Sequence, residues 1–165
     1  MKGLGTALIT PFTTDGKIDY DSLGQLIEHQ VAGGTDYLVI LGTTSEVPTI
    51  THKEQDEIIT YVVKQVAGRM PLVLGIGGNS TAAVVERIEE LKEQLVAHFA
   101  AILSVTPYYN RPQQEGLYLH FSAVAEASPV PVILYNVPKR TGVNLLPETT
   151  RRISDAHPGK VMGSK

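Results

Sequence analysis

The sequence predicts an α/β fold in which short apolar strands alternate with longer amphipathic helices. Strand-like runs begin roughly 30 to 35 residues apart, which is the length of one strand–helix unit. The runs are continuously apolar, as is typical of parallel strands buried on both faces. These observations predict one domain of about five and a half strand–helix units that spans residues 1–165.

The strands are recognised from apolar, β-branched runs that Gly, Pro or polar residues interrupt. The first run ends at Pro11, which cannot donate a backbone hydrogen bond to a neighbouring strand. The last run begins at Val161. The expected strands cover residues 4–12, 37–41, 72–76, 101–105, 132–135 and 161–162.

The helices are recognised from apolar side chains at helical spacing and from capping residues. Thr51 and Glu54 form a capping-box pattern, and Pro147 suits a first helical position. Glycines at 33 and 34 end the first helix. The expected helices begin at Asp19 or Asp21, at Thr51, after Asn79 or Ser80, at Gln113 and at Pro147.

Residues 86–100 form an unusually regular, charge-rich segment. Its Glu and Lys spacing gives favourable pairs three and four residues apart, which predicts a helix from Thr81 to about Leu95. The following residues, 97–100, contain no Gly or Pro, so the expected turn lacks its usual chemistry.

The unit count fits either an open doubly wound sheet or part of a (β/α)8 barrel. A dinucleotide site is discounted, because no Gly-x-Gly-x-x-Gly pattern follows the first strand. The glycine-rich stretch 75–79 lacks the third glycine and an acidic residue for a ribose.

Composition excludes several classes of function. Charged residues make up 19% and the net charge is −3, so nothing supports binding to nucleic acid or to an anionic membrane. Cys is absent, which excludes disulfides, thiolate metal sites and a thiol nucleophile. The N-terminus lacks the features of a signal peptide, and no apolar run approaches membrane-spanning length. We expect a soluble, cytoplasmic protein.

Polar residues of unusual type follow four of the strands. Thr43 and Thr44 beside Gly42 suit a carboxylate or phosphate, although they also fit a loop that caps itself. Tyr108 and Tyr109 form a stiff aromatic loop, typical of an interface or a binding site but also of a packed rim.

The last two strands carry further candidates. Tyr135 ends an apolar run, where its hydroxyl could relay protons, and Arg140 offers a fork that matches a carboxylate. Lys165 lies on the sixth strand, where burial would lower its pKa and give a neutral amine able to form a Schiff base. Each candidate also has a purely structural interpretation. Tyr135 could be a core residue, Arg140 could form a solvated pair with the adjacent Lys139, and Lys165 could be solvated.

Four motifs resemble the dihydrodipicolinate synthase family, class I aldolases that include N-acetylneuraminate lyase. They are Gly-Thr-Thr-x-Glu at 42–46, Val-Thr-Pro-Tyr-Tyr-Asn-Arg-Pro at 105–112, Gln-Glu-Gly-Leu-Tyr at 114–118 and Leu-Tyr-Asn-Val-Pro-x-Arg-Thr-Gly at 134–142. The resemblance runs from about residue 2 to residue 148 and implies the barrel, with all four motifs at one face. It also implies a lyase of lysine and diaminopimelate biosynthesis. That lyase condenses pyruvate with aspartate semialdehyde.

The resemblance further implies the roles of the site residues. Lys165 would form the Schiff base, Tyr135 would shuttle protons, and Thr43 would link Tyr135 to Tyr109. Tyr109 would come from a neighbouring subunit, so a homo-oligomer, a dimer or a tetramer, is expected. No metal or organic cofactor is needed.

Two substrate carboxylates are assigned in the same way. Thr44 would bind the pyruvate carboxylate, and Arg140 the carboxylate of aspartate semialdehyde. Arg140 favours the synthase over N-acetylneuraminate lyase.

The sequence departs from the family at several positions. Ser45 replaces a Gly or Ala, a change that we expect to be tolerated. Gln55 and Ala83 depart from the lysine-feedback pattern of some family members. His52, Asn79 and Tyr108 match it, and weak or no inhibition by lysine is predicted. The sixth strand reads Met-Gly-Ser-Lys, and strands seven and eight are absent. The open edges of strands one and six predict aggregation, tight self-association or a rearranged closure. An inactive truncated or designed fragment, and another pyruvate-dependent aldolase such as N-acetylneuraminate lyase, remain alternatives.

Overall fold

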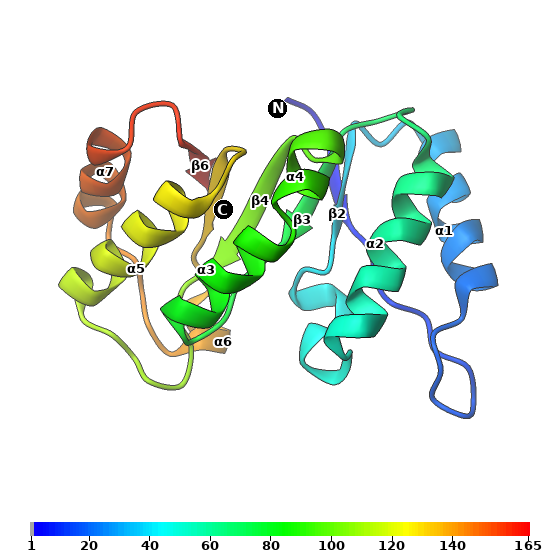
Figure 1. The fold of residues 1–165 in the computed structure, drawn as a ribbon, viewed down its shortest axis with the longest axis horizontal. Coiled ribbons are helices and arrows are strands. Elements are labelled where there is room, and N and C mark those ends of the chain that lie inside the picture. The colour runs from blue at the N-terminus through cyan, green and yellow to red at the C-terminus, as the bar shows by residue number, and fades with distance from the viewer. Residues whose placement is uncertain (1) are drawn as a thin grey trace. The chain divides into compact units, whose positions relative to one another are not determined.

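The computed structural model describes residues 2–165 and divides them into two compact units, one ending at Gly75 and the other spanning Ile76–Lys165 (Figure 1). Each unit contains three parallel strands with helices in the connections between them. The six strands lie where the apolar runs predicted them. The single domain over residues 1–165 stays a prediction.

The first unit pairs β1 (Gly5–Ala7) with β2 (Tyr37–Ile40), and β2 with β3 (Leu72–Gly75). Two helices, α1 (Tyr20–Ala32) and α2 (His52–Val66), lie side by side and connect these strands (Figure 1). Their buried apolar side chains, with those of the strands, form the core of this unit. This core includes Leu23, Ile27, Leu38, Ile40, Ile59, Val62, Val73 and Leu74.

Capping begins both helices of the first unit where the sequence predicted. Asp19 accepts a hydrogen bond from the Ser22 backbone N–H at 2.9 Å. Thr51 and Glu54 form the complete capping box. Each cap satisfies backbone donors that the first turn of a helix leaves without a partner. The expected choice between Asp19 and Asp21 is therefore resolved in favour of Asp19.

The second unit pairs β4 (Ala101–Val105) with β5 (Val132–Tyr135), and β5 with β6 (Val161–Ser164). Its helices are α3 (Thr81–Glu90), α4 (Lys92–His98), α5 (Gln114–Ala127), α6 (Pro138–Thr141) and α7 (Pro147–Ala156).

Helix α5 packs against both α3 and α7 (Figure 1). Phe121 is fully buried on α5, and the Nδ1 atom of His120 lies 2.8 Å from the Thr81 hydroxyl of α3. On the α7 side, Arg152 pairs with Glu115 and lies 3.6 Å above the centre of the Tyr118 ring. These contacts fix the helices that support β4 and β5.

The expected continuous helix over residues 81–95 is wrong in one respect, because it breaks at Leu91. Leu91 stands between α3 and α4 with φ −93° and ψ 5°, and it is buried, as is Leu95. Helix α4 then ends at His98, and Phe99 is extended with its ring buried. Helix α4 thus ends at a buried, extended Phe99 without a Gly or Pro.

The first strand is shorter than expected. Strand β1 covers only three residues, and after it Ile9 is 49% exposed. Phe12 instead forms an isolated antiparallel bridge with Ile18. In the last strand, β6, the residues from Met162 onward are exposed. Within residues 2–165, no helix combines the length and apolar character needed to cross a membrane.

Candidate active site

Tyr135 and Lys165 lie next to each other at the carboxyl ends of β5 and β6. The parallel register pairs Leu134 with Ser164, and the Lys165 N–H donates to the Leu134 carbonyl at 2.8 Å. Neighbouring positions in a parallel sheet point to the same face. The Nζ atom of Lys165 lies 5.2 Å from the centre of the Tyr135 ring as a result.

Lys165 is exposed in the structure, which corrects the expectation that it is buried. The alternative that the sequence left open, a solvated lysine, is the one observed. Tyr135 is the side chain that the structure brings to its ammonium group. Tyr135 itself is half-buried.

The loop after β4 carries Tyr109 and is bent into an uncommon backbone conformation. Tyr109 has φ 72° and Arg111 has φ 46°. Both values lie in the left-handed region, which residues other than glycine rarely adopt. The Tyr109 side chain is 90% exposed. The Asn110 side chain donates to the Asn79 carbonyl at 3.0 Å, which holds the tip of the loop. Strain of this kind is common at functional sites.

The loop after β5 carries Arg140 on the short helix α6. Arg140 is exposed, and the helix ends at Gly142 with φ 72°. The Arg111 guanidinium lies against Gly142, so close that a Cβ at residue 142 would stand 2.9 Å from its Nε atom. The loops that bear Tyr109 and Arg140 are therefore in contact, and Arg111, to which the sequence argument gave no role, makes that contact.

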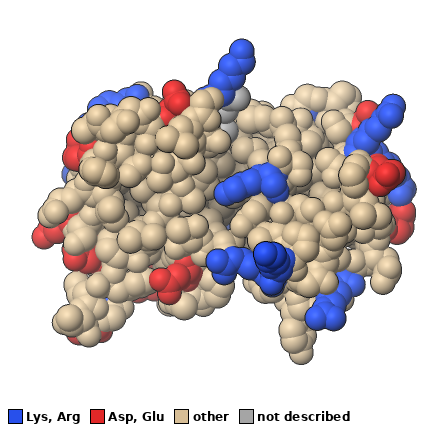
Figure 2. Space-filling model, turned by 180° about the vertical axis from the view of Figure 1, so that it is seen from behind, with Lys and Arg blue, Asp and Glu red and all other residues tan. Residues whose placement is uncertain are grey.

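Basic side chains without acidic partners characterise this part of the second unit. Arg111, Lys139, Arg140 and Lys165 are all exposed, and within residues 2–165 none of them forms an ion pair. On the face drawn in Figure 2, several Lys and Arg side chains are surrounded by uncharged surface, whereas blue and red atoms adjoin near the edges. Unpaired cations on an uncharged surface favour binding of an anion.

The other two predicted residues lie in the first unit, in a 3-10 turn over Thr43–Ser45 that follows β2. The side chains of Thr43 and Thr44 are exposed. Ser45 is buried, and its hydroxyl donates to the Leu8 carbonyl at 2.7 Å. Ser45 therefore anchors the turn to the chain after β1, a role beyond the tolerance that the sequence predicted.

Backbone strain also surrounds this turn. Leu41 before it and Glu46 after it have φ values of 51° and 56°. The Leu41 carbonyl lies so close to Gly75 that any Cβ at residue 75 would overlap it. A glycine is therefore required at residue 75 by the close approach of the backbone. The sequence argument considered Gly75 only as part of a glycine-rich stretch that does not bind a dinucleotide.

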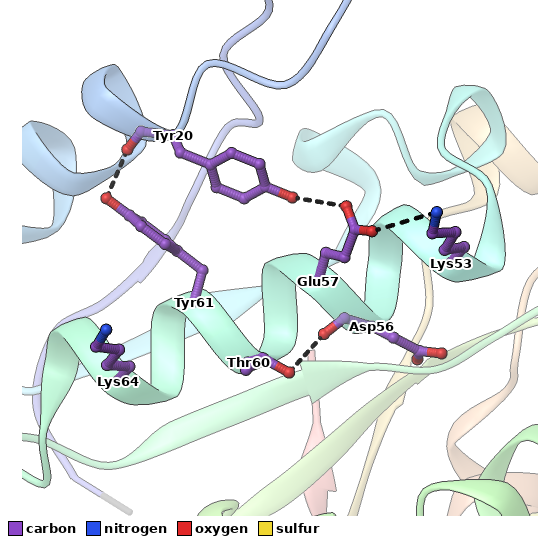
Figure 3. A pocket seen from close by; sticks show the side chains of 7 residues that line it. All are labelled: Tyr20, Lys53, Asp56, Glu57, Thr60, Tyr61 and Lys64. Carbon is purple, nitrogen blue, oxygen red and sulfur yellow. Dashed lines mark hydrogen bonds and ion pairs between the residues drawn. The ribbon is translucent and has the colours of Figure 1, made fainter.

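A groove of about 510 Å³ lies elsewhere in the first unit, between α1 and α2 (Figure 3). Tyr20 and Tyr61 line it, with their ring centres 5.0 Å apart. The Tyr20 hydroxyl donates to Glu57 at 3.3 Å, and burial, followed by the Glu57 carboxylate, raises the pKa of Tyr20. None of the six predicted site residues lines this groove, so it is separate from the candidate site.

Residues 2–165 contain no group of three His, Asp or Glu side chains placed to hold a metal ion. Asn136 and Gln114, two amides in the quoted motifs, bind the Arg140 loop and were not singled out from the sequence. Asn136 directly follows Tyr135, and Gln114 is the first residue of α5. These positions next to the candidate residues could have identified the two amides from the sequence.

Several known proteins are similar to this chain in sequence or in structure. A 4-hydroxy-tetrahydrodipicolinate synthase of Parabacteroides distasonis is 56% identical over 154 residues, which is 93% of this chain and 51% of that protein. The crystal structure of dihydrodipicolinate synthase from Aquifex aeolicus matches with a TM-score of 0.91 and 40% identity, over 100% of this chain and 55% of that one.

A third protein is the chloride-inhibited dihydrodipicolinate synthase of Acinetobacter baumannii, described as complexed with pyruvate. It matches with a TM-score of 0.91 and 40% identity, over 99% of this chain and 54% of that one.

The chain spans about half the length of these relatives. The structural likeness over the full chain confirms the predicted fold class, an incomplete (β/α)8 barrel. The model of the Dihydrodipicolinate synthetase family matches residues 1–165. The chain belongs to the Dihydrodipicolinate synthetase family.

Proposed function

We propose that this chain carries the catalytic residues of a 4-hydroxy-tetrahydrodipicolinate synthase, a lyase that condenses pyruvate with aspartate 4-semialdehyde. The observation that carries the proposal is the pairing of Lys165 with Tyr135 at the ends of adjacent strands. The Nζ atom of Lys165 lies 5.2 Å from the centre of the Tyr135 ring. The names of the relatives support it. Nothing observed favours N-acetylneuraminate lyase.

The first step is formation of a Schiff base at Lys165. The neutral amine attacks the C2 carbonyl of pyruvate, and the carbonyl oxygen leaves as water after it has taken up two protons. Tyr135, whose ring lies beside the amine, would deliver and recover protons through its hydroxyl. No metal is required, because the protonated imine itself withdraws electrons from the pyruvate methyl group.

Two threonines are proposed to serve this step. Thr44 would hold the pyruvate carboxylate through its exposed hydroxyl. Thr43 would pass protons between Tyr135 and Tyr109. The rigid anchor that Ser45 gives to the turn supports a fixed position for both hydroxyls.

The second step forms the carbon–carbon bond. Loss of a proton from the methyl group gives an enamine, whose carbon attacks the aldehyde of the second substrate, and the aldehyde oxygen becomes a hydroxyl. The amino group of the semialdehyde then displaces Lys165 from the imine carbon and closes the ring. Arg140 would bind the carboxylate of this substrate with two parallel hydrogen bonds, which its lack of an ion pair leaves it free to make.

We also propose a homo-oligomer, a dimer or a tetramer, that works in the cytoplasm. Tyr109 is 90% exposed and held at φ 72°, which supports a role in the site of a neighbouring subunit. Sedimentation velocity tests this proposal, which a purely monomeric chain at micromolar concentration would contradict.

Trapping with borohydride tests the chemistry. The protein is incubated with pyruvate, reduced, digested and analysed by mass spectrometry, and the adduct is expected at Lys165. Lys165→Arg should abolish it, while Lys139→Arg, at another exposed lysine without an ion pair among residues 2–165, should not. A stably folded chain without any adduct at Lys165 would establish the inactive fragment instead.

A further inference from the structure

The loop after β5 is closed on itself by the side chain of Asn136. Its Oδ1 atom accepts a hydrogen bond from the Leu145 N–H at 3.0 Å. Its Nδ2 atom donates to the Leu145 carbonyl at 3.2 Å and to Oδ1 of Asn144 at 2.8 Å. Helix α6, with Arg140, lies between these two ends. One amide therefore closes the ten-residue segment 136–145 into a loop.

The backbone of the same residue holds the end of β6. The Asn136 N–H donates to the Lys165 carbonyl at 2.9 Å, and the Lys165 N–H donates to the Leu134 carbonyl at 2.8 Å. Asn136 is thus bound to Lys165 through its backbone and to the Arg140 loop through its side chain.

A second amide holds the far end of the loop from the other side. Gln114, on the first turn of α5, donates to the Asn144 carbonyl at 2.8 Å. Its Oε1 atom accepts from the Leu146 N–H at 3.2 Å and from the Thr149 hydroxyl at 2.6 Å. Residues 144–146 are therefore fixed to α5 as well as to β5.

The chemistry of an amide suits residue 136. The side chain must donate and accept at once, which an ionised carboxylate cannot do. An acidic side chain would also face the Leu145 carbonyl and would add a negative charge to the loop that carries Arg140, which disfavours a substrate carboxylate there. A neutral amide closes the loop without changing its positive charge.

We propose that Asn136 is a positioning residue, which sets the place of Arg140 relative to the Lys165–Tyr135 pair through the closed loop 136–145. The chemical roles of Lys165 and Arg140 rest on the proposed function, whereas closure of the loop does not. Losing the side chain should loosen binding of the second substrate while pyruvate still reacts at Lys165.

Three variants and one control test the proposal. Asn136→Ala removes all three side-chain hydrogen bonds but keeps the backbone bond to Lys165. Asn136→Asp keeps the acceptor for Leu145 and loses both donations. Asn144→Ala removes one bond and is the milder variant if the others fold poorly. Gln94→Ala, at an exposed amide of α4 without a hydrogen-bond partner among residues 2–165, is the matched control.

Hydrogen exchange, read by mass spectrometry or NMR at the amides of Leu145 and Leu146, reports closure without any substrate. We expect exchange about 10-fold faster in Asn136→Ala and unchanged in Gln94→Ala, because opening of a local segment sets the rate. Asn144→Ala should have a smaller effect. Exchange at Leu145 that is unchanged in Asn136→Ala overturns the proposal.

Phenylglyoxal modification of Arg140 reports positioning. The concentration of aspartate semialdehyde that half-protects Arg140 should rise about 10-fold in Asn136→Ala, as expected for a misplaced binding group, and further in Asn136→Asp. The pyruvate concentration for half-maximal trapping at Lys165 should stay within about twofold of the parent value, because the backbone bond remains.

The two readouts separate the ways of failing. Equal half-protection in the parent and Asn136→Ala, with both folded, overturns the positioning role. An equal loss of pyruvate trapping and of protection in a folded variant overturns it as well, because a residue that positions Arg140 would leave trapping at Lys165 intact. If the parent chain traps no pyruvate, the proposed function fails. Exchange at Leu145 and Leu146 then still decides whether Asn136 closes the loop.

Discussion

The Nζ atom of Lys165 lies 5.2 Å from the centre of the Tyr135 ring, on the neighbouring strand. A cation over an exposed aromatic face gains about 0.5–1 kcal/mol, so the ring itself helps to hold the lysine chain in place. The hydroxyl makes no hydrogen bond within residues 2–165 and is available for proton transfer. Ring and hydroxyl can therefore be tested separately.

Removing the hydroxyl alone should slow Schiff-base formation. Tyr135→Phe keeps the ring over Lys165 and is expected to lower the rate of borohydride trapping about 100-fold, the usual loss on removing a proton donor. Thermal stability should not change, because no hydrogen bond is lost. Tyr37→Phe, which removes a hydroxyl from β2, is the control. Trapping by Tyr135→Phe at the parent rate would exclude the hydroxyl from the reaction.

The buried bond between Ser45 and Leu8 should contribute to stability. Ser45→Ala leaves the Leu8 carbonyl without the hydroxyl at 2.7 Å, and a buried acceptor that loses its partner costs about 1–3 kcal/mol. Urea unfolding should show a lower midpoint. Ser154→Ala, at a half-buried serine of α7 without a comparable bond, should leave the midpoint near that of the parent. Equal midpoints for both variants would contradict a stabilising role for Ser45.

Two glycines with similar backbone angles offer a matched comparison. Gly142 has φ 72° and Gly159 has φ 78°, so Ala at either position carries the same backbone strain of about 1–2 kcal/mol. A Cβ at residue 142 would also press on Arg111, whereas a Cβ at residue 159 meets no atom within 4 Å.

Gly142→Ala should therefore destabilise the protein more than Gly159→Ala, in urea unfolding at one temperature. It should also speed phenylglyoxal modification of Arg111, because the added Cβ displaces the guanidinium from its contact with residue 142. If Gly159→Ala is equally destabilising, the contact with Arg111 has no energetic role.

His120 should make the fold sensitive to acid. Burial lowers the pKa of this histidine from 6.5 to about 4, so the folded protein keeps it neutral. Between these two pH values the unfolded chain binds a proton that the folded chain does not. The free energy of unfolding should therefore fall as the pH drops through this range, by about 3 kcal/mol in all.

Urea unfolding at pH 7, 6, 5 and about 4.5 measures this dependence. His120→Gln cannot take up the proton and should flatten the curve even if it lowers stability overall. Replacing the exposed His98 in the same way should leave the parent slope. A slope that survives in His120→Gln assigns the acid sensitivity to another group.

Lysine should bind weakly. Gln55 stands where the family pattern has a second histidine, and its amide is already bound to the Ile50 carbonyl at 3.0 Å. Ala83 replaces a glutamate and offers no charge for the ammonium group of lysine. Isothermal titration with lysine should therefore detect no tight site, and micromolar affinity would refute this prediction.

Local patterns were sufficient for most of the fold. The six apolar runs became β1 to β6, and Asp19, Thr51 and Ser80 cap helices within a residue of where the spacing predicted. A cap or an apolar strand depends on residues a few positions apart, which the sequence displays directly. The break at Leu91 has no Gly or Pro to mark it, so the local sequence does not display it.

The site divides in the same way. The residue types at the strand ends, and their family motifs, identified Tyr135, Arg140 and Lys165 as candidates. Register then decided that Tyr135 and Lys165 are neighbours, since pairing of β5 with β6 is a contact between residues 30 positions apart. The exposure of Lys165 corrected the expected burial, because burial depends on which chain segments surround a side chain.

By itself, the sequence determined the strand–helix order, the caps, the family and the side chains suited to a Schiff-base reaction. The tertiary structure alone decided that Ser45 anchors its turn to Leu8, that Arg111 packs on Gly142 and that Asn136 joins Lys165 to the Arg140 loop. Each of these contacts links residues that only the folded chain brings within bonding distance. Directional hydrogen bonds and close packing act over a few ångströms, so spacing along the chain does not reveal them.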